Sequence, residues 1–517
     1  MRYKNGAKQK NNMPKIELQN KNLLDIVSPA SIFFYFKDAS PSKELREIDK
    51  KTGGLFFRIM KEESFEGKSG QYFMFHAHAH GFILERIIVV GLGEKKNLTL
   101  SEYAKHFGTM LRHLQKKKIT KASTYIPAEL KQKFSAEIVA KEIAKTAYTS
   151  PYDFFNFKSD KDEKVTPFEE IVISEPDKKK NKEIQKGIDE GIVLGRFINM
   201  VRDAGNQPSK IATPTYLANL AQDIAKENKA IKVKIFNRED MEKLKMGGLL
   251  GVSQGSDEPA KFIVMEYRGK PKSKDIYAFV GKAITFDSGG ISLKPSEKMD
   301  DMKYDMSGGG AVICAMGAIA SLNLPINIVG IVPSCENLPG GRSYKPGDIL
   351  VAMNGKSMEI ANTDAEGRVI LADALSYVDA TYKPKGIIDL ATLTGACVVA
   401  LGDHVAGLLG NNQKLINDVK RAAEASGDRV WQMPLWKEYF SQIKSDFADM
   451  KNVGGRNGGT ITAAAFLSNF VGDTPWAHVD IAGTAWHEME KPHMKRGATG
   501  FGLSLLVKLA KDLAKKK

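Results

Sequence analysis

The sequence predicts an α/β protein with a smaller N-terminal α/β domain and a larger C-terminal α/β domain that has a central, mostly parallel sheet. Between residues 14 and 150, short β-rich runs alternate with helical patterns, which is typical of α/β domains. Beyond residue 205, nearly continuous apolar runs alternate with helices, as expected for strands buried on both faces of a parallel sheet. At 517 residues, the chain is long enough for two such domains.

The predicted domain boundaries follow changes in charge and periodicity. Residues 1–13 are basic and lack the apolar core of a signal peptide, so we expect a mobile tail. We place the N-terminal domain at 14–182, because a highly charged stretch from 159 to 182 marks its end. Helical periodicity predicts a connecting helix over 183–204, and the C-terminal domain then spans 205–517.

Individual elements follow from local patterns. In the N-terminal domain, "SIFFYF" and "RIIVVGLG" predict strands, and "SEYAKHFGTMLRHLQKKK" predicts a helix. In the C-terminal domain, the apolar runs predict four strands, namely 261–266, 275–281, 326–333 and 385–395. The run "AVICAMGAIASL" (311–322) is too short to span a bilayer and predicts a buried helix. Ligands of such sheets bind at the carboxyl ends of the strands.

The net charge of +15 raises the question of a nucleic-acid partner. The lysine clusters at 116–118, 178–180 and 515–517 lack the interleaved aromatic residues of a base-stacking surface. We therefore interpret the charge as solvated surface and keep nucleic-acid binding only as an alternative.

The cysteines and the absence of a membrane segment bear on location. Cys314, Cys335 and Cys397 are widely spaced and odd in number, which favours a reducing compartment over a disulfide framework. No apolar run is long enough to predict a transmembrane helix. We expect a cytoplasmic protein.

The stretch "NTDAEGRVILADAL" (362–375) sets Asp364, Glu366 and Arg368 at alternate positions before an aliphatic run. Thr363 followed three residues later by Glu366 fits a helix capping box, which is a purely structural interpretation. If the segment is extended instead, the three charges point to one side and converge. Both interpretations stay open on this stretch alone.

Three further stretches bring polar residues to predicted strand ends. "VGKAITFDSGGISLK" supplies Lys282, Asp287 and Lys294. "MDDMKYDMSGGG" supplies Asp305, and "DLATLTGA" supplies a polar loop over 389–396. Together with "NTDAEGR", these stretches could place four carboxylates, two lysines and an arginine in one cleft.

Four neighbouring carboxylates repel one another, and their burial in ionised form requires cations. Divalent metal ions would balance the charge, and oxygen ligands without histidine or cysteine favour manganese or magnesium, with zinc still open. A two-metal site activates a bridging water and polarises a carbonyl or phosphoryl group. No phosphate loop or basic fork accompanies the acids, so phosphoryl transfer is the weaker interpretation. From spacing alone, Lys282 is best interpreted as an ion-pair partner of the acids.

These stretches, in this order and spacing, resemble the leucyl aminopeptidase (cytosol aminopeptidase) family. "NTDAEGR" is similar to the signature of that family. The similarity continues through "VDIAGTAW" and "RGATG" and covers residues 195 to 510, whereas the N-terminal part is only loosely comparable.

The resemblance implies two divalent metal ions per subunit, either manganese or zinc, with magnesium also open. One ion would be held by Lys282, Asp287, Asp305 and Glu366, and the other by Asp287, Asp364 and Glu366. Lys282 would then be a neutral amine ligand, which replaces the ion-pair interpretation and requires a strongly lowered pKa.

The resemblance also implies the reaction, which is hydrolysis of the peptide bond after an unblocked N-terminal residue, with leucine and other apolar residues preferred. Lys294 would stabilise the developing oxyanion. Arg368 would hold a bicarbonate ion that acts as general base. The substrate amine would dock on a metal and against Asp305, and candidates to line the substrate pocket are Met302, Thr392, Leu393 and Gly395. Members of this family have a small N-terminal domain and a larger catalytic metallopeptidase domain, and they assemble as homohexamers.

Overall fold

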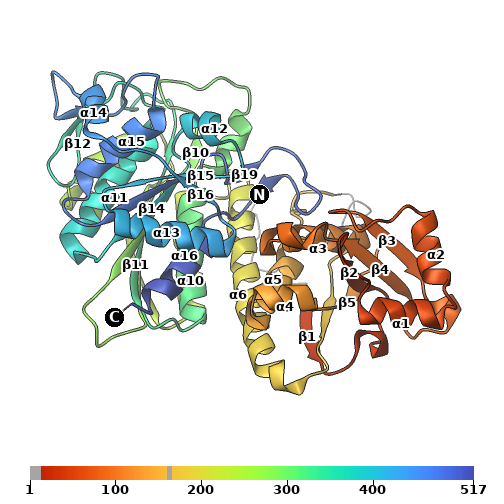
Figure 1. Cartoon of the computed structure of the whole chain (residues 1–517). Coiled ribbons are helices and arrows are strands. Elements are labelled where there is room, and N and C mark those ends of the chain that lie inside the picture. Colours follow the sequence, from red (N-terminus) through yellow and green to blue (C-terminus); the bar gives the residue numbers. More distant parts are fainter. Residues whose placement is uncertain (1–12, 160–165, 517) are drawn as a thin grey trace. The chain divides into compact units, whose positions relative to one another are not determined.

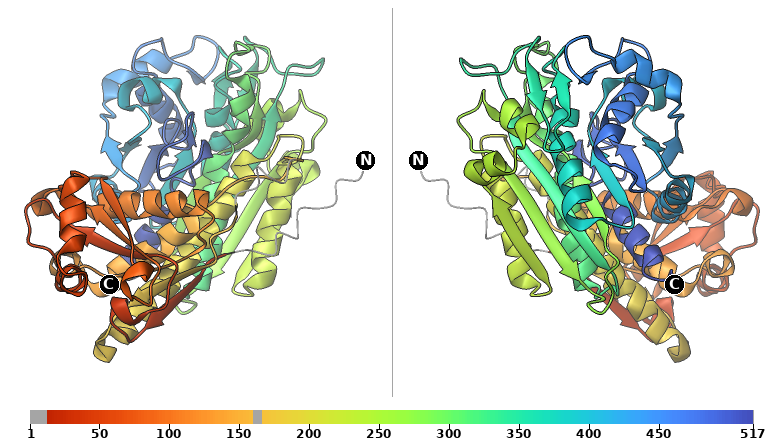
Figure 2. Two further views of the ribbon diagram at one scale, coloured as in Figure 1. Left: turned by 90° about the vertical axis from the view of Figure 1, so that its right-hand side faces the viewer. Right: turned by 90° about the vertical axis from the view of Figure 1, so that its left-hand side faces the viewer.

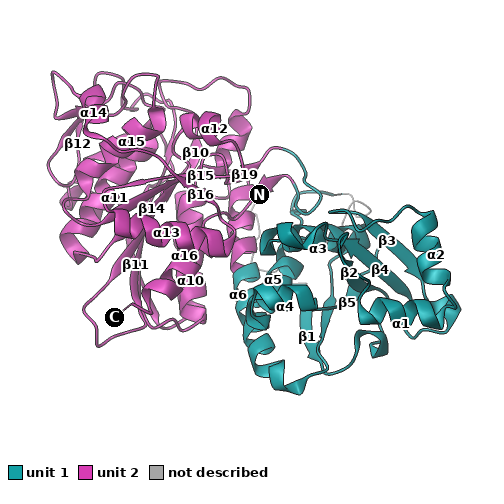
Figure 3. Ribbon diagram, in the orientation of Figure 1, with its two compact units in different colours: residues 1–196, 489–495 teal, residues 197–488, 496–517 magenta. Residues whose placement is uncertain are grey.

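The computed structural model describes residues 13–159 and 166–516 (Figure 1). The predicted basic tail over 1–13 therefore lies outside the described residues except for Met13. The chain divides into two compact units (Figure 3), and each is described separately. The first comprises residues 1–196 with 489–495, and the second comprises 197–488 with 496–517.

The division falls inside one long helix, α6 (Asn181–Asn206), where the sequence predicts a connecting helix over 183–204. The short segment 489–495 belongs to the first unit, which no pattern in the sequence predicts. Its charged side chains explain this assignment. Glu490 accepts a hydrogen bond from the buried Arg112 at 2.6 Å, and Lys495 lies 3.4 Å from Asp153.

The N-terminal unit contains a six-stranded sheet in the order β1-β6-β5-β2-β4-β3. All neighbouring strands are parallel except β3 and β4. The strands are β1 (Lys15–Gln19), β2 (Ser31–Tyr35), β3 (Tyr72–His76), β4 (Arg86–Gly91), β5 (Lys121–Tyr125) and β6 (Glu170–Ser174). The helices are α1 (Lys43–Lys51), α2 (Leu55–Glu62), α3 (Leu100–Lys116), α4 (Ala128–Lys133) and α5 (Ala136–Thr149).

Side chains that alternate along these strands supply two separate cores. Phe34 and Val90 pack in one core with residues of α3 and α5. Phe33 and Val89 pack in another with residues of α1 and α2. Because successive residues of a strand face opposite sides, both faces of this sheet are covered by helices, as predicted for an α/β domain.

The C-terminal unit contains a nine-stranded sheet in the order β16-β15-β18-β14-β9-β11-β8-β7, with β10 paired to the end of β11. The central strands are parallel, and antiparallel pairs occur at β7–β8, β8–β11 and β15–β18. The strands are β7 (Ile231–Phe236), β8 (Lys261–Arg268), β9 (Tyr277–Gly281), β10 (Ala283–Asp287), β11 (Asn327–Asn337), β14 (Ile387–Ala391), β15 (Ala406–Gly410), β16 (Val430–Gln432) and β18 (Trp476–Asp480). This topology confirms the predicted mostly parallel sheet.

Helices and two small sheets complete this unit. The helices are α7 (Pro214–Glu227), α8 (Arg238–Lys243), α9 (Gly247–Ser253), α10 (Ser307–Ser321), α11 (Glu366–Tyr382), α12 (Gly395–Leu401), α13 (Gln413–Ser426), α14 (Lys437–Phe440), α15 (Gly459–Leu467) and α16 (Leu503–Leu513). The small sheets are formed by β12 (Ile349–Val351), β13 (Ser357–Glu359) and β17 (Met450–Lys451), and by β19 (Trp486–His487) and β20 (Gly497–Ala498). The predicted buried helix over 311–322 is confirmed as most of α10.

Strand β11 shows why the sheet lies between helical layers (Figure 2). All 11 of its residues are buried. Val329 and Ile331 share a core with residues of α11, whereas a Cβ on Gly330 would meet Met316 of α10 at 2.8 Å. Helices α10 and α11 therefore cover opposite faces, and the parallel strands between them end at one common edge.

The sequence predicts a strand over 326–333, but β11 continues to Asn337. Residues 334–337 are mostly polar, so the apolar pattern ends before the strand does. Pairing with β10 explains the extension, because Ser334 lies opposite Ala283 and Asn337 lies opposite Asp287. The strand is thereby carried into the region where the predicted site residues lie.

The described helices include none that is both long enough and apolar enough to cross a membrane. Cys314, Cys335 and Cys397 are all buried.

A buried carboxylate on α11 leads to a stability prediction. Asp373 is fully buried and accepts backbone hydrogen bonds from Leu249 and Met353, both at 2.8 Å. Asp373→Ala would leave the buried N–H of Leu249 and the partly buried N–H of Met353 without acceptors, so we expect the free energy of unfolding to fall by about 3 kcal/mol. Urea unfolding measures this change, and Asp373→Asn, which keeps one acceptor, should lose less. Equal midpoints for the wild type and the alanine variant would contradict the prediction.

Candidate active site

The residues predicted to act together lie at the carboxyl ends of neighbouring strands in the C-terminal unit. Lys282 links β9 to β10, and Asp287 ends β10. Asp305 follows the 3₁₀ helix η5 (Met299–Tyr304), and Glu366 is the first residue of α11. Thr392 follows β14 directly. The fold thus gathers segments that are more than 100 residues apart in the sequence.

Three of the predicted metal ligands form a compact carboxylate group. Asp287, Asp364 and Glu366 each offer one oxygen, and these three oxygens lie within 4.8 Å of one another. Asp287 and Glu366 are 3% and 1% exposed, and Oε2 of Glu366 has no hydrogen-bond partner. Burial and the charge on Asp287 raise the pKa of Glu366 to about 8. A donor set of buried, incompletely partnered carboxylate oxygens fits a divalent cation.

Lys282 lies on the buried side of this carboxylate group. Its Nζ is 2.7 Å from Oδ2 of Asp305 and 2.8 Å from Oε1 of Glu366. It also donates a hydrogen bond to the carbonyl oxygen of Thr392 at 2.9 Å. Burial acts to lower the pKa of Lys282, but Asp305 and Glu366 outweigh burial and raise it. Without metal ions, Lys282 is therefore the ion-pair partner that its spacing suggests, and its role as a neutral ligand stays a prediction.

Lys294 lies against the same group at a more accessible position. Its Nζ is 2.8 Å from Oδ2 of Asp287 and 2.5 Å from Oδ1 of Asp364. The side chain is 21% exposed, compared with 3% for Lys282. Burial acts to lower the pKa of Lys294, and the neighbouring carboxylates raise it. A lysine at this edge keeps its charge and can approach a ligand that enters from solvent.

The "NTDAEGR" stretch adopts neither of the two local geometries considered from the sequence. Helix α11 begins at Glu366, and its N-cap residue Ala365 makes no side-chain capping bond. The Thr363 hydroxyl instead donates to the carbonyl oxygen of Gly289 at 2.6 Å and accepts from the N–H of Ser292 at 2.8 Å. The capping-box interpretation is therefore wrong, because the Thr363 hydroxyl bonds to the loop that contains Gly289 and Ser292 and not to the first turn of α11.

An extended segment through Arg368 is also excluded, since Glu366 and Arg368 both lie in the first turn of α11. Asp364 and Glu366 still converge, but they do so across the junction between a loop and a helix.

Arg368 is buried beside the cluster, with one guanidinium donor unused. It is 7% exposed and donates from Nη1 to the carbonyl oxygen of Asn452 at 2.9 Å. Its Nε is buried without a hydrogen-bond partner. Burial lowers the pKa of Arg368 to about 10, partly opposed by Glu366. A buried guanidinium with an unused donor is suited to hold a small anion.

The predicted substrate-pocket residues lie in two segments. Met302 is partly buried in η5, three residues before Asp305. Thr392 is buried and donates its hydroxyl to Oδ1 of Asp305 at 2.7 Å. Leu393 is partly buried, and Gly395 is the exposed first residue of α12. The structure thus joins Thr392 to the predicted metal ligands by hydrogen bonds, whereas the pocket roles of the other three stay predictions.

Gly289 and Gly290 shape the turn after β10. Their φ angles are +86° and +67°, a region that other residues enter only with strain. A Cβ on Gly289 would lie 2.9 Å from Oδ1 of Asp364. The turn therefore needs glycine both for its backbone and for the close approach of a predicted metal ligand.

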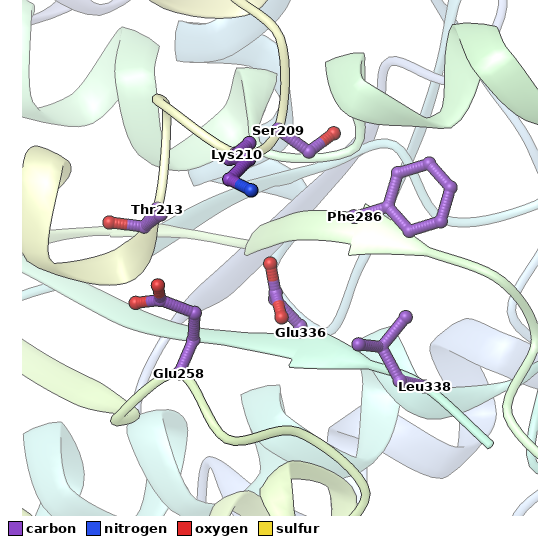
Figure 4. Close-up of a pocket in the computed structure, with 7 residues that line it drawn as sticks. All are labelled: Ser209, Lys210, Thr213, Glu258, Phe286, Glu336 and Leu338. Atoms are coloured by element: carbon purple, nitrogen blue, oxygen red, sulfur yellow. The ribbon is translucent and has the colours of Figure 1, made fainter. Parts of the chain in front are cut away.

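A separate pocket of about 320 Å³ lies nearby (Figure 4). Its lining includes Phe286 and Glu336, the immediate neighbours of Asp287 and Asn337. Glu336 and Asn337 are successive residues of β11, so their side chains face opposite sides of the sheet, and the pocket lies on the side of Glu336. The lining residues are Ser209, Lys210, Thr213, Glu258, Phe286, Glu336 and Leu338, and none is a predicted site residue.

Two polar residues that support the site were missed from the sequence. Asn337 donates to Oδ1 of Asp287 at 2.8 Å and to the carbonyl oxygen of Thr363 at 3.0 Å. Asn452 supplies the carbonyl that Arg368 contacts. Asn337 could have been suspected, because it follows an apolar strand, but Asn452 lies in a loop without any recognisable pattern.

Comparison with known proteins agrees with this geometry. The catalytic-domain profile of the cytosol aminopeptidase family matches residues 199–507, and the profile of its N-terminal domain matches residues 32–161. The chain belongs to the cytosol aminopeptidase family. It is therefore an aminopeptidase, a class of hydrolase, as the resemblance implies.

Relatives in the cytosol aminopeptidase family match along most of the chain. A protein of Nitrosococcus oceani named "Probable cytosol aminopeptidase" is 44% identical over 473 residues, which are 91% of this chain and 93% of the relative. A protein of the same name from Geobacter sp. (strain M21) is 40% identical over 494 residues, 95% of this chain and 99% of the relative. The similarity therefore includes the N-terminal unit, which the motifs alone did not cover.

Solved structures match the fold. A mutant of tomato leucine aminopeptidase is 32% identical, with a TM-score of 0.86 and coverage of 97% of both chains. The bottromycin maturation enzyme BotP in complex with Mn is 27% identical, with a TM-score of 0.82 and coverage of 94% of this chain and 100% of that chain. The predicted two-domain α/β architecture of the cytosol aminopeptidase family is thus confirmed.

Proposed function

We propose that this aminopeptidase uses two divalent metal ions to hydrolyse the peptide bond after an unblocked N-terminal residue, with leucine and other apolar residues preferred. The observation that carries the proposal is the carboxylate group of the buried Asp287 and Glu366 and the half-buried Asp364, each of which offers one oxygen within 4.8 Å of the other two. Asp305 joins this group through Lys282, which lies within 2.8 Å of both Asp305 and Glu366.

The ligand assignment follows the arrangement of these side chains. Lys282, Asp287, Asp305 and Glu366 would hold one ion, and Asp287, Asp364 and Glu366 would hold the other. When bound, the ions would supply an activated water and polarise the carbonyl group that is attacked. The choice among manganese, zinc and magnesium stays open, and the Mn complex of BotP makes manganese the first ion to test.

The chain's own charged groups supply the rest of the chemistry. Lys294 would donate to the carbonyl oxygen as negative charge develops there. Arg368, with its unused Nε donor, would hold bicarbonate as the general base. The carboxylate of Asp305 would accept the free α-amine of the substrate, so a blocked N-terminus would lose this contact. Met302, Thr392, Leu393 and Gly395 are the proposed pocket residues.

Assembly and location belong to the same proposal. The family resemblance supports a homohexamer. The cytoplasm is the proposed location, supported by the name of the relatives.

The proposal predicts metal-dependent cleavage of free-amine substrates. Metal-stripped protein should not release chromophore from leucyl-p-nitroanilide, and added manganese, zinc or magnesium should restore release to different degrees. The N-acetylated substrate should stay intact under every condition, because its amine cannot dock. Chromophore release is followed by absorbance. Equal cleavage of both substrates, or full activity after metal removal, would overturn the proposal.

A further inference from the structure

Asp480 is a fully buried carboxylate that none of the predicted roles uses. It ends β18, which lies beside β14 in parallel register, with Asp480 opposite Ala391. Its Oδ1 accepts hydrogen bonds from the N–H groups of Leu393 at 3.1 Å and Ala482 at 3.2 Å. Its Oδ2 accepts the hydroxyl of Thr394 at 2.5 Å. Two of its three donors thus belong to the loop that leaves β14.

The same loop reaches the predicted metal ligands through Thr392. The carbonyl oxygen of Thr392 accepts from Nζ of Lys282 at 2.9 Å. Its hydroxyl donates to Oδ1 of Asp305 at 2.7 Å. A short path therefore runs from Asp480, through the backbone of residues 392–394, to Lys282 and Asp305.

The hydroxyl of Thr394 fixes the other end of this loop. It accepts a hydrogen bond from the N–H of Cys397, which caps the start of α12, and lies 2.9 Å from the hydroxyl of Thr460. The loop is thus held between the end of β14 and the first turn of α12. The carboxylate of Asp480 accepts hydrogen bonds from both Leu393 and Thr394 and thereby stabilises the backbone conformation of this loop.

Asp287 has other supports. Its Oδ1 accepts from Asn337 at 2.8 Å and from the N–H of Gly289 at 2.9 Å. Within the described parts of the chain, the side chain of Asp287 accepts no hydrogen bond from residues 392–394. The loop of residues 392–394 therefore contacts Lys282 and Asp305, which are proposed as ligands of one ion only, and not Asp287, which is proposed as a ligand of both.

We propose that Asp480 is a positioning residue that orders residues 392–394 and thereby holds Lys282 and Asp305 in place for one of the two proposed metal ions. The inference rests on the proposed two-metal function. Outer residues that orient metal ligands change affinity by about 10- to 100-fold when they are replaced. The other ion, held by Asp287, Asp364 and Glu366, should be little affected.

The test is manganese binding to the metal-stripped full-length protein, measured by isothermal titration calorimetry with manganese as the only added ligand. For the wild type, we expect two ions per subunit. For Asp480→Asn, which keeps one oxygen but cannot accept at both positions, one ion should bind as in the wild type and the other about 10- to 100-fold more weakly. Amide hydrogen exchange should also quicken at Leu393.

Two further comparisons separate positioning from loss of folding. Asp389→Asn changes another buried carboxylate of the same sheet, which pairs with His478 and Trp476 and not with the loop. Because it weakens these buried contacts, it should lower the melting temperature while leaving both manganese affinities unchanged. Thr394→Val removes one of the three hydrogen bonds to Asp480 and should weaken binding of the same single manganese ion. Thr394→Ser keeps the hydroxyl and should bind both ions with wild-type affinity.

The outcomes distinguish the two proposals. A wild-type protein that binds fewer than two ions overturns the two-metal function and this inference with it. Two ions in the wild type and two unchanged affinities in Asp480→Asn overturn the inference alone. Equal weakening of both ions in Asp480→Asn and Thr394→Val also overturns it, because a general loss of structure would then explain the result.

Discussion

Asp287→Ala is expected to lose bound metal and to reduce kcat/KM about a thousandfold, as follows from the loss of several kcal/mol of transition-state stabilisation. Asp287 is 3% exposed, and one of its oxygens lies within 4.8 Å of those offered by Asp364 and Glu366. In the proposed function Asp287 would be a ligand of both ions, so its removal should affect both positions. Elemental analysis of the purified protein, together with kinetics on leucyl-p-nitroanilide, measures the two effects.

Lys294→Ala should separate catalysis from metal binding. In the proposed function, Lys294 acts on the substrate oxygen and binds no ion, so its loss should lower kcat by about a hundredfold, as for removal of one oxyanion donor. Metal content should stay near normal. The matched control is Lys298→Ala, which removes an exposed lysine of the same segment that pairs with Glu488. That variant should keep wild-type turnover, and equal loss of metal in Asp287→Ala and Lys294→Ala would contradict the division of roles.

Gly367→Ala is expected to reduce activity strongly although alanine favours helices. Gly367 is the second residue of α11, where alanine would ordinarily stabilise the helix by about 1 kcal/mol. A Cβ at this position would lie 2.5 Å from Cε and 2.7 Å from Nζ of Lys282. Lys282 cannot move aside without leaving Asp305, Glu366 and the carbonyl oxygen of Thr392. We expect kcat/KM to fall about a hundredfold, because a displacement of 1 Å can have that effect.

The control for this prediction is Gly310→Ala, near the start of α10. A Cβ there would meet nothing closer than the 3.4 Å to Met306, which is an ordinary contact. Steady-state kinetics and thermal unfolding of both variants give the comparison. If Gly367→Ala were as active as Gly310→Ala, the position of Lys282 against α11 would not matter for catalysis.

The fold class followed from the sequence because the strands of a doubly covered sheet must be apolar on both faces. The run 326–333 predicted a buried strand for this reason, and β11 is buried at all 11 residues. The extension of β11 to Asn337 did not follow, because Ser334 and Asn337 are polar. Their burial depends on pairing with β10, a contact between segments about 50 residues apart.

The candidate site was predicted residue by residue, but its local geometry was not. Four acidic residues in three motifs indicated metal binding, because buried carboxylates need cations. Whether Thr363 caps a helix or fastens a loop could not be decided from its spacing to Glu366. The structure answers this question, because the hydroxyl of Thr363 donates to the carbonyl oxygen of Gly289 and accepts from the N–H of Ser292.

By itself, the sequence predicted the chemical groups of the candidate site, namely four carboxylates, two lysines and an arginine, and the strands whose ends carry them. Only the tertiary structure decided which groups meet and what holds them. Lys282 pairs with Asp305 and Glu366. Asp480 accepts hydrogen bonds from Leu393 and Thr394 in the loop that follows β14. The physical reason is that spacing along a chain fixes contacts only within one helix or strand. Contacts between distant segments depend on the packing of the whole sheet and its helices.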